Sequence, residues 1–152
     1  QYLKIRPQYV DDRMRCDAAL LIGDEALLEK AKGDWPFCYD LALLWREWQG
    51  LPFVFGAWSV HRSALSSEML PKTKRFLAYV QESIGAFREN PARALSLWAG
   101  RYAVPFTAGE LKGYYDSLDY EFTEERKRSL RIYFNLCAAE GIFDVAPPLR
   151  FL

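Results

Sequence analysis

Histidine and cysteine are scarce in this sequence. His61 is the single histidine, and the three cysteines, Cys16, Cys38 and Cys137, are widely separated and set among apolar neighbours. An odd number of isolated cysteines fits reduced, buried thiols better than a disulfide framework or a zinc site. Because a catalytic cysteine usually needs a histidine partner, we expect none of the thiols to act as a nucleophile. No metal site is predicted.

The chain also lacks an excess of either charge and any long apolar run. Twenty Lys and Arg balance twenty Asp and Glu, so no overall field would draw the protein to nucleic acid or to an anionic membrane. No run reaches the roughly 18 apolar residues that a membrane span needs, and residues 1–4 do not begin a signal peptide. We therefore expect a cytoplasmic protein without a nucleic-acid or membrane partner.

Apolar and aromatic residues, in contrast, are plentiful. They make up 51% and 16% of the 152 residues, which is enough for the core of one ordinary domain. Residues 17–23 form a continuous apolar run, typical of a strand that is covered on both faces in a parallel sheet. Asp24 is well placed to cap a helix over residues 25–32, which Gly33 would end. Residues 6–10 are a candidate edge strand.

The central third of the chain repeats this pattern. A short strand is predicted at residues 37–39, and Asp40 can cap a helix that ends at Gly50 and whose apolar stripe comprises Leu41, Leu44, Trp45 and Trp48. The segment GLPFVFGAW, residues 50–58, then carries three aromatic rings and no charge. Pro52 suits the first position of a strand, so the segment is predicted to be a strand buried on both sides.

The remainder of the chain is predicted to be helical. Pro71 opens one helix, and a second is expected over residues 91–101. Thr107 with Glu110 resembles a capping box, and Thr123 can cap a helix running to Gly141, whereas the prolines exclude a helical tail. The fold class is therefore α/β over the first 60 residues and all-helical beyond them.

Three ordered blocks carry a family resemblance. LLIGDEAL at residues 20–27, YDLALLWREWQGLPFVFGAW at residues 39–58 and LRFL at residues 149–152 together resemble the C-terminal half of the MqnA family, the chorismate dehydratases of the futalosine pathway of menaquinone biosynthesis. The sister enzyme, 1,4-dihydroxy-6-naphthoate synthase, has a similar arrangement but tends to continue with PLG, so the FVF here favours the dehydratase. At three positions, Ala42, Gln49 and Gly56, the residue differs from the family pattern without removing a charge. The connection between the candidate edge strand at residues 6–10 and the strand beginning at Ala18 is also shorter than the dozen or so residues that a parallel crossover needs.

The resemblance implies a fold like that of the type II periplasmic binding proteins, in which two α/β lobes enclose a ligand. This chain would form the C-terminal portion. Residues 1–50 would be part of the second α/β lobe, residues 51–62 the hinge strand, and residues 63–152 a helical part that returns to the first lobe. The N-terminal lobe of the same protein would then be a partner of this chain.

The resemblance also implies an activity, the loss of water from chorismate to give 3-enolpyruvylbenzoate, which needs no metal and no redox cofactor. Gly23, Asp24, Phe53 and Phe55 are the expected substrate-binding residues, because strand ends and an apolar hinge face the cleft in such folds. A carboxylate would repel a dicarboxylate substrate, so Asp24 would contact a hydroxyl group. The catalytic base is not assigned.

Each of these residues also has a purely structural interpretation. Asp24 could simply cap its helix, the rings could be core, and His61 with Arg62 could be solvated. Three alternatives to the enzyme stay open: a non-catalytic solute-binding protein of the same fold, the sister naphthoate synthase, and an inactive fragment.

Overall fold

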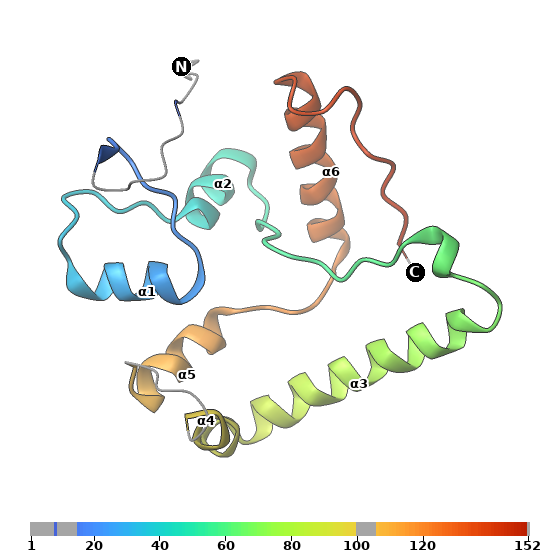
Figure 1. Cartoon of the computed structure of the whole chain (residues 1–152), viewed down its shortest axis with the longest axis horizontal. Coiled ribbons are helices and arrows are strands. Elements are labelled where there is room, and N and C mark those ends of the chain that lie inside the picture. Colours follow the sequence, from blue (N-terminus) through green and yellow to red (C-terminus); the bar gives the residue numbers. More distant parts are fainter. Residues whose placement is uncertain (1–7, 9–14, 100–105, 152) are drawn as a thin grey trace. The chain divides into compact units, whose positions relative to one another are not determined.

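The computed structural model describes residue 8 and residues 15–99 and 106–151 of the chain. The chain divides into two compact units, Gln1–Leu44 and Trp45–Leu152, and each is described by itself. Within the described ranges all regular structure is helical (Figure 1). The helices are α1 (Gly23–Lys32), α2 (Leu41–Gln49), the short 3-10 helix η2 (Arg62–Ala64), α3 (Met69–Glu89), α4 (Pro91–Ala99), α5 (Ala108–Ser117) and α6 (Glu124–Ala139).

The start of α1 corrects the predicted cap. Ile22 occupies the N-cap position in an extended conformation, without a side-chain cap, and Gly23 opens the helix at φ 64°. Asp24 therefore lies inside the first turn and is exposed, where its carboxylate favours the positive end of the helix dipole. The other end is as predicted, since Gly33 ends the helix in the left-handed conformation at φ 70°.

One buried carboxylate anchors the first unit. Glu29 is largely buried on α1, accepts a hydrogen bond from Lys32 Nζ at 2.7 Å and accepts another from Trp35 Nε1 at 3.1 Å. A buried charge is tolerated when it is paired and hydrogen-bonded in this way. The contact fixes the segment after α1 against the helix.

The prediction for α2 is confirmed at both ends. Asp40 Oδ1 accepts hydrogen bonds from the backbone N–H of Ala42 at 2.8 Å and of Leu43 at 3.2 Å, which makes Asp40 the cap. Gly50, at φ 68°, donates its N–H to the carbonyl of Arg46 at 2.8 Å and ends the helix. Of the predicted apolar stripe, Trp45 is buried, whereas Leu41, Leu44 and Trp48 stay roughly half exposed.

The predicted strands are not formed as paired strands. Residues 17–22, 37–39 and 53–55 have no helical or sheet assignment, and Leu20 and Ile22 are 82% and 80% exposed. A strand needs a neighbour for its backbone hydrogen bonds, and no ladder partner lies within the described ranges. The edge strand predicted at residues 6–10 lies outside the described residues except for Gln8, which has no regular structure.

The helical predictions for the remainder of the chain are confirmed where the structure describes them. Pro71 lies in the first turn of α3, where its missing N–H costs nothing. Thr107 and Glu110 form the predicted capping box of α5, because Thr107 donates its N–H to Glu110 Oε2 at 2.8 Å while its hydroxyl accepts from the Glu110 N–H at 3.2 Å. Thr123 caps α6. Residues 100 and 101, at the end of the helix predicted over residues 91–101, lie outside the described residues.

The end of α6 turns the chain back along the helix (Figure 1). The N–H of Ile142 bonds to the carbonyl of Cys137 at 2.8 Å, and that of Gly141, at φ 74°, to Ala138 at 3.0 Å. This pair of bonds is a Schellman motif. The returning tail, residues 140–151, then packs on α6: Phe143 contacts Phe134, and Phe151 lies under two cations of the helix, Lys127 and Arg131, each 5.2 Å from its ring centroid.

The core of the second unit lies where α2 meets α6. Trp45 Nε1 donates a hydrogen bond to Ser129 Oγ at 2.8 Å, and Ser129 is 1% exposed. Among the residues that the structure describes, the other buried apolar ones are Leu51, Leu95, Leu111 and Cys137. The three cysteines form no disulfide; Cys137 is buried as expected, but Cys38 is exposed, contrary to the prediction.

A first prediction concerns the buried hydrogen bond. Ser129→Ala leaves the Trp45 N–H without an acceptor, so we expect the free energy of unfolding to fall by about 1–3 kcal/mol. Ser96→Ala is the matched control, because Ser96 is an exposed helical serine whose hydroxyl bonds to the carbonyl of Arg93. Urea unfolding followed by circular dichroism measures both, and equal losses in the two variants would contradict the assignment.

A second prediction concerns the ion pair at the start of α6. Asp119 accepts from the Glu121 N–H at 2.9 Å and from Arg126 at 2.5 Å, and these contacts hold the pKa of Asp119 below its usual value of 3.8. Because the folded pKa is the lower one, this stabilisation is present above pH 3.8 and is lost as the pH falls through the folded pKa. Unfolding of Asp119→Asn, followed by circular dichroism in urea, should therefore depend less on pH below 4 than that of the parent, and an equal pH dependence of the two proteins would contradict the assignment.

Candidate functional site

The segment Gly50–Trp58 passes from buried to exposed along its length. Leu51 is buried and Phe53 is partly buried, while Phe55 is 66% and Trp58 is 73% exposed. The prediction that this segment is buried on both sides is therefore wrong for its second half. Its rings are not sealed inside the hydrophobic interior, and Phe55 is available for contact with a ligand.

Phe53 and Phe55 belong to an aromatic cluster that joins α2, the segment and α6. Phe53 contacts the rings of Trp45, Phe55 and Tyr133 at centroid distances of 5.4, 4.9 and 5.6 Å, all edge to face. Such pairs contribute about 0.5–1.5 kcal/mol each beyond the burial of their area. The cluster comprises Trp45, Trp48, Phe53, Phe55, Tyr133 and Phe134.

Two hydrogen bonds to residues of α6 support the cluster: one from Trp45 to Ser129, and one between Tyr133 and Cys137. The Trp45 indole is fixed by Ser129, as described above, and the Tyr133 ring lies 6.0 Å from that of Trp45. Hydrogen bonding to the Cys137 thiol raises the pKa of the Tyr133 hydroxyl above its usual value of 10.0. Tyr133 is therefore neutral at physiological pH, and the cluster carries no charge.

The two other predicted site residues belong to the first unit. Gly23 opens α1 in the left-handed region, and Asp24 is exposed in the first turn, next to Glu25. The structure thus brings Phe53 and Phe55 together, and places Gly23 and Asp24 at one helix N-terminus. His61 is exposed after the segment, with its Nδ1 2.7 Å from the Ser63 hydroxyl.

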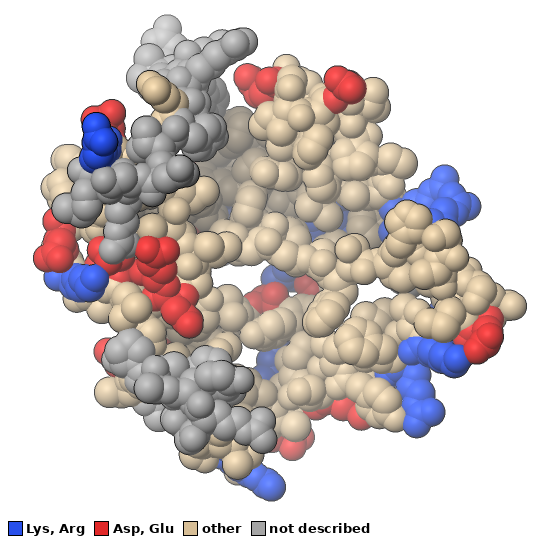
Figure 2. Space-filling model, viewed as in Figure 1, with Lys and Arg blue, Asp and Glu red and all other residues tan. Residues whose placement is uncertain are grey.

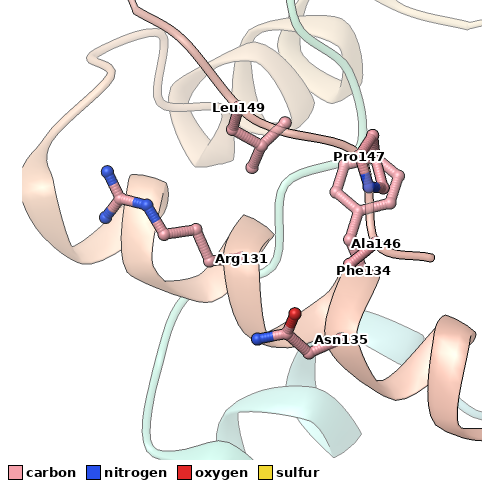
Figure 3. A pocket seen from close by; sticks show the side chains of 6 residues that line it. All are labelled: Arg131, Phe134, Asn135, Ala146, Pro147 and Leu149. Atoms are coloured by element: carbon pink, nitrogen blue, oxygen red, sulfur yellow. The ribbon is translucent and has the colours of Figure 1, made fainter.

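Two concave surfaces lie in the second unit, and one of them shares Phe134 with the cluster. One is a cavity of about 220 Å³ between α6 and the tail, lined by Arg131, Phe134, Asn135, Ala146, Pro147 and Leu149. Figure 3 shows Leu149 pointing from the tail towards the helix, with Arg131 and Asn135 extending from successive turns of α6. The other is a groove of about 310 Å³ where the end of the segment meets α3, lined by Trp58, Ser59, Val60, Met69, Lys72, Thr73, Phe76 and Leu77.

The lining of each concave surface has one basic side chain, Arg131 or Lys72, and no acidic one. On the face that Figure 2 shows, acidic and basic side chains of the described residues are interspersed, without a broad area of one sign. No group of His, Cys, Asp and Glu that could hold a metal ion lies within the described parts of the chain. Among the helices that the structure describes, none is both long and apolar enough to cross a membrane.

The comparisons with known proteins identify the family. A family model described as menaquinone biosynthesis matches residues 2–139 of the chain. The chain therefore belongs to the menaquinone biosynthesis family, which is consistent with the MqnA resemblance of its sequence blocks. No solved structure matches the chain.

The support that α6 gives to the cluster was not among the predicted site residues: Tyr133, which belongs to the cluster, and Ser129, which bonds to Trp45. Tyr133 and Ser129 lie four residues apart on α6, so they share one face of the helix. The signal in the sequence was a small hydroxyl residue on the same stripe as Leu130, Tyr133 and Cys137, where a large apolar residue would be expected. Nothing in the sequence pattern pointed to Arg131 and Asn135.

Proposed function

We propose that this chain is part of a chorismate dehydratase, which removes water from chorismate to form 3-enolpyruvylbenzoate in menaquinone biosynthesis. Membership of the menaquinone biosynthesis family supports the pathway. The observation that carries the specific activity is the segment Gly50–Trp58, in which FVF follows GLP and the rings of Phe53 and Phe55 are partly open. The FVF sequence favours the dehydratase over the sister naphthoate synthase.

The proposed reaction suits an uncharged aromatic wall. One ring C–H bond breaks, its electron pair forms the last ring double bond, and the hydroxyl on the neighbouring carbon leaves with a proton as water. The ring becomes flat and aromatic in this step, so a wall that fits a planar ring binds the transition state better than the puckered substrate. Phe53 and Phe55 would form this wall, and the catalytic base is not among the residues we assign.

The proposed fold is that of a type II periplasmic binding protein, with this chain as the C-terminal portion. The support is the unusual exposure of its extended segments: Leu20, Ile22, Phe37 and Tyr39 are all at least two-thirds exposed. Exposed apolar patches of this kind mark surfaces that another structure covers. In the proposal, the N-terminal lobe of the same protein supplies the neighbouring strands and the other wall of the cleft.

Gly23 and Asp24 keep a proposed role at the N-terminus of α1. The first N–H groups of a helix attract anions, so they could hold one carboxylate of a dicarboxylate substrate. Asp24 itself would repel that group. Its carboxylate suits the hydroxyl of the substrate instead, as a hydrogen-bond acceptor.

The assay that tests the activity follows the absorbance of chorismate after addition of the intact protein. Loss of chorismate with formation of 3-enolpyruvylbenzoate, detected by mass spectrometry, is the expected result. Binding without turnover, measured by isothermal titration calorimetry, would contradict it in favour of a solute-binding protein. Turnover of cyclic dehypoxanthine futalosine instead would identify the naphthoate synthase.

The role of Phe53 is tested by Phe53→Ala in the same intact protein. We expect kcat/KM for chorismate to fall at least about tenfold, equivalent to about 1.4 kcal/mol of transition-state stabilisation. Phe87→Ala is the matched control, because Phe87 is also partly buried and packs on one tyrosine, Tyr115 at 5.2 Å. If both variants lose stability and activity in parallel, Phe53 is plain core and not part of a substrate wall.

A further inference from the structure

The Phe53 ring contacts one ring from each of two helices, and those two rings also contact each other, at a centroid distance of 6.0 Å. Trp45 of α2 meets it at an interplanar angle of 71°, and Tyr133 of α6 at 85°. The three rings pack edge to face in a triangle, and this packing restricts the tilt of Phe53 relative to its two neighbours. The orientation of Phe53 is therefore set by helices that lie on either side of the segment in sequence.

Both supports depend on one face of α6. Ser129 fixes the Trp45 indole through the buried hydrogen bond, and Tyr133 follows Ser129 by four residues. The ring of Tyr133 also contacts that of Phe134, at a centroid distance of 5.7 Å. The segment itself has no paired strand in the described parts of the chain, so these side-chain contacts take the place of backbone ladder bonds in fixing Phe53.

We propose that Trp45 and Tyr133 are positioning residues for the ring of Phe53, and that Ser129 acts through Trp45. The inference rests on the proposed function, in which the free side of Phe53 faces the substrate ring. A flat wall assists aromatisation only if its plane is already aligned with the product ring, since a small misalignment costs much of the gain from orientation. The two helices supply that alignment before substrate binds.

The test separates the ring from the hydroxyl of Tyr133. Tyr133→Phe keeps the edge-to-face contact and should retain kcat within about twofold, whereas Tyr133→Leu should lower kcat about tenfold with little change in the dissociation constant of chorismate. Tyr115→Leu is the control, because Tyr115 packs on Phe87 and Tyr114, outside the cluster. A stability defect alone would not split kcat from binding in this way.

A second readout needs no activity. With para-fluorophenylalanine at position 53, the fluorine NMR signal of the intact protein should be single, and should shift and broaden in Tyr133→Leu and Ser129→Ala but not in Tyr115→Leu. An unchanged fluorine signal in both cluster variants would overturn the inference, whatever the activity. Failure of the parent protein to consume chorismate would instead overturn the proposed function, and the fluorine spectra would still show whether the ring is held.

Discussion

The hydrogen bond between the Trp45 indole and the Ser129 hydroxyl is the contact on which the second unit depends. It joins residues 84 positions apart, and both are buried. A serine at this point lets the large indole approach the α6 backbone, and its hydroxyl satisfies an N–H that would otherwise be buried without an acceptor. Trp45 in turn contacts Trp48, Phe53 and Tyr133, so one polar contact orders an otherwise apolar cluster.

The cluster suits a substrate with an apolar ring, and its lack of charge has a chemical consequence. A neutral aromatic wall can orient a ring without binding its carboxylates, so the anionic groups of a dicarboxylate must find their partners elsewhere. The helix N-terminus at Gly23 and Asp24 is one place in this chain with suitable backbone donors.

The sequence correctly predicted the helix ends that depend on neighbouring residues in the chain. Asp40, Thr107 and Thr123 cap the helices predicted for them, and Gly33 and Gly50 end theirs. Each of these residues lies within one turn of the helix end that it determines, so the prediction requires no knowledge of distant contacts. Asp24 failed for an equally local reason, because Gly23 adopts a positive φ and lets the helix begin one residue ahead of the expected cap.

Non-local features were harder to predict. Residues 17–23 and the segment Gly50–Trp58 have the composition of buried strands, but composition does not supply the neighbour that a ladder needs, and the described residues hold no such neighbour. Likewise, Phe53 and Phe55 were expected at the site, whereas their supports on α6 were not. The pairing of Trp45 with Ser129 depends on how two distant helices pack, which helical periodicity alone does not reveal.

The contact between α2 and α6 also closes a long loop that contains α3, α4 and α5. The entropy of closing a loop rises only with the logarithm of its length, so doubling the loop would cost about 0.6 kcal/mol. A change in the length of the segment that contains α3, α4 and α5 should therefore have little effect on the stability of the cluster. Contacts between residues far apart in sequence form slowly during folding. Helices α3, α4 and α5 can therefore form well before α2 and α6 come into contact.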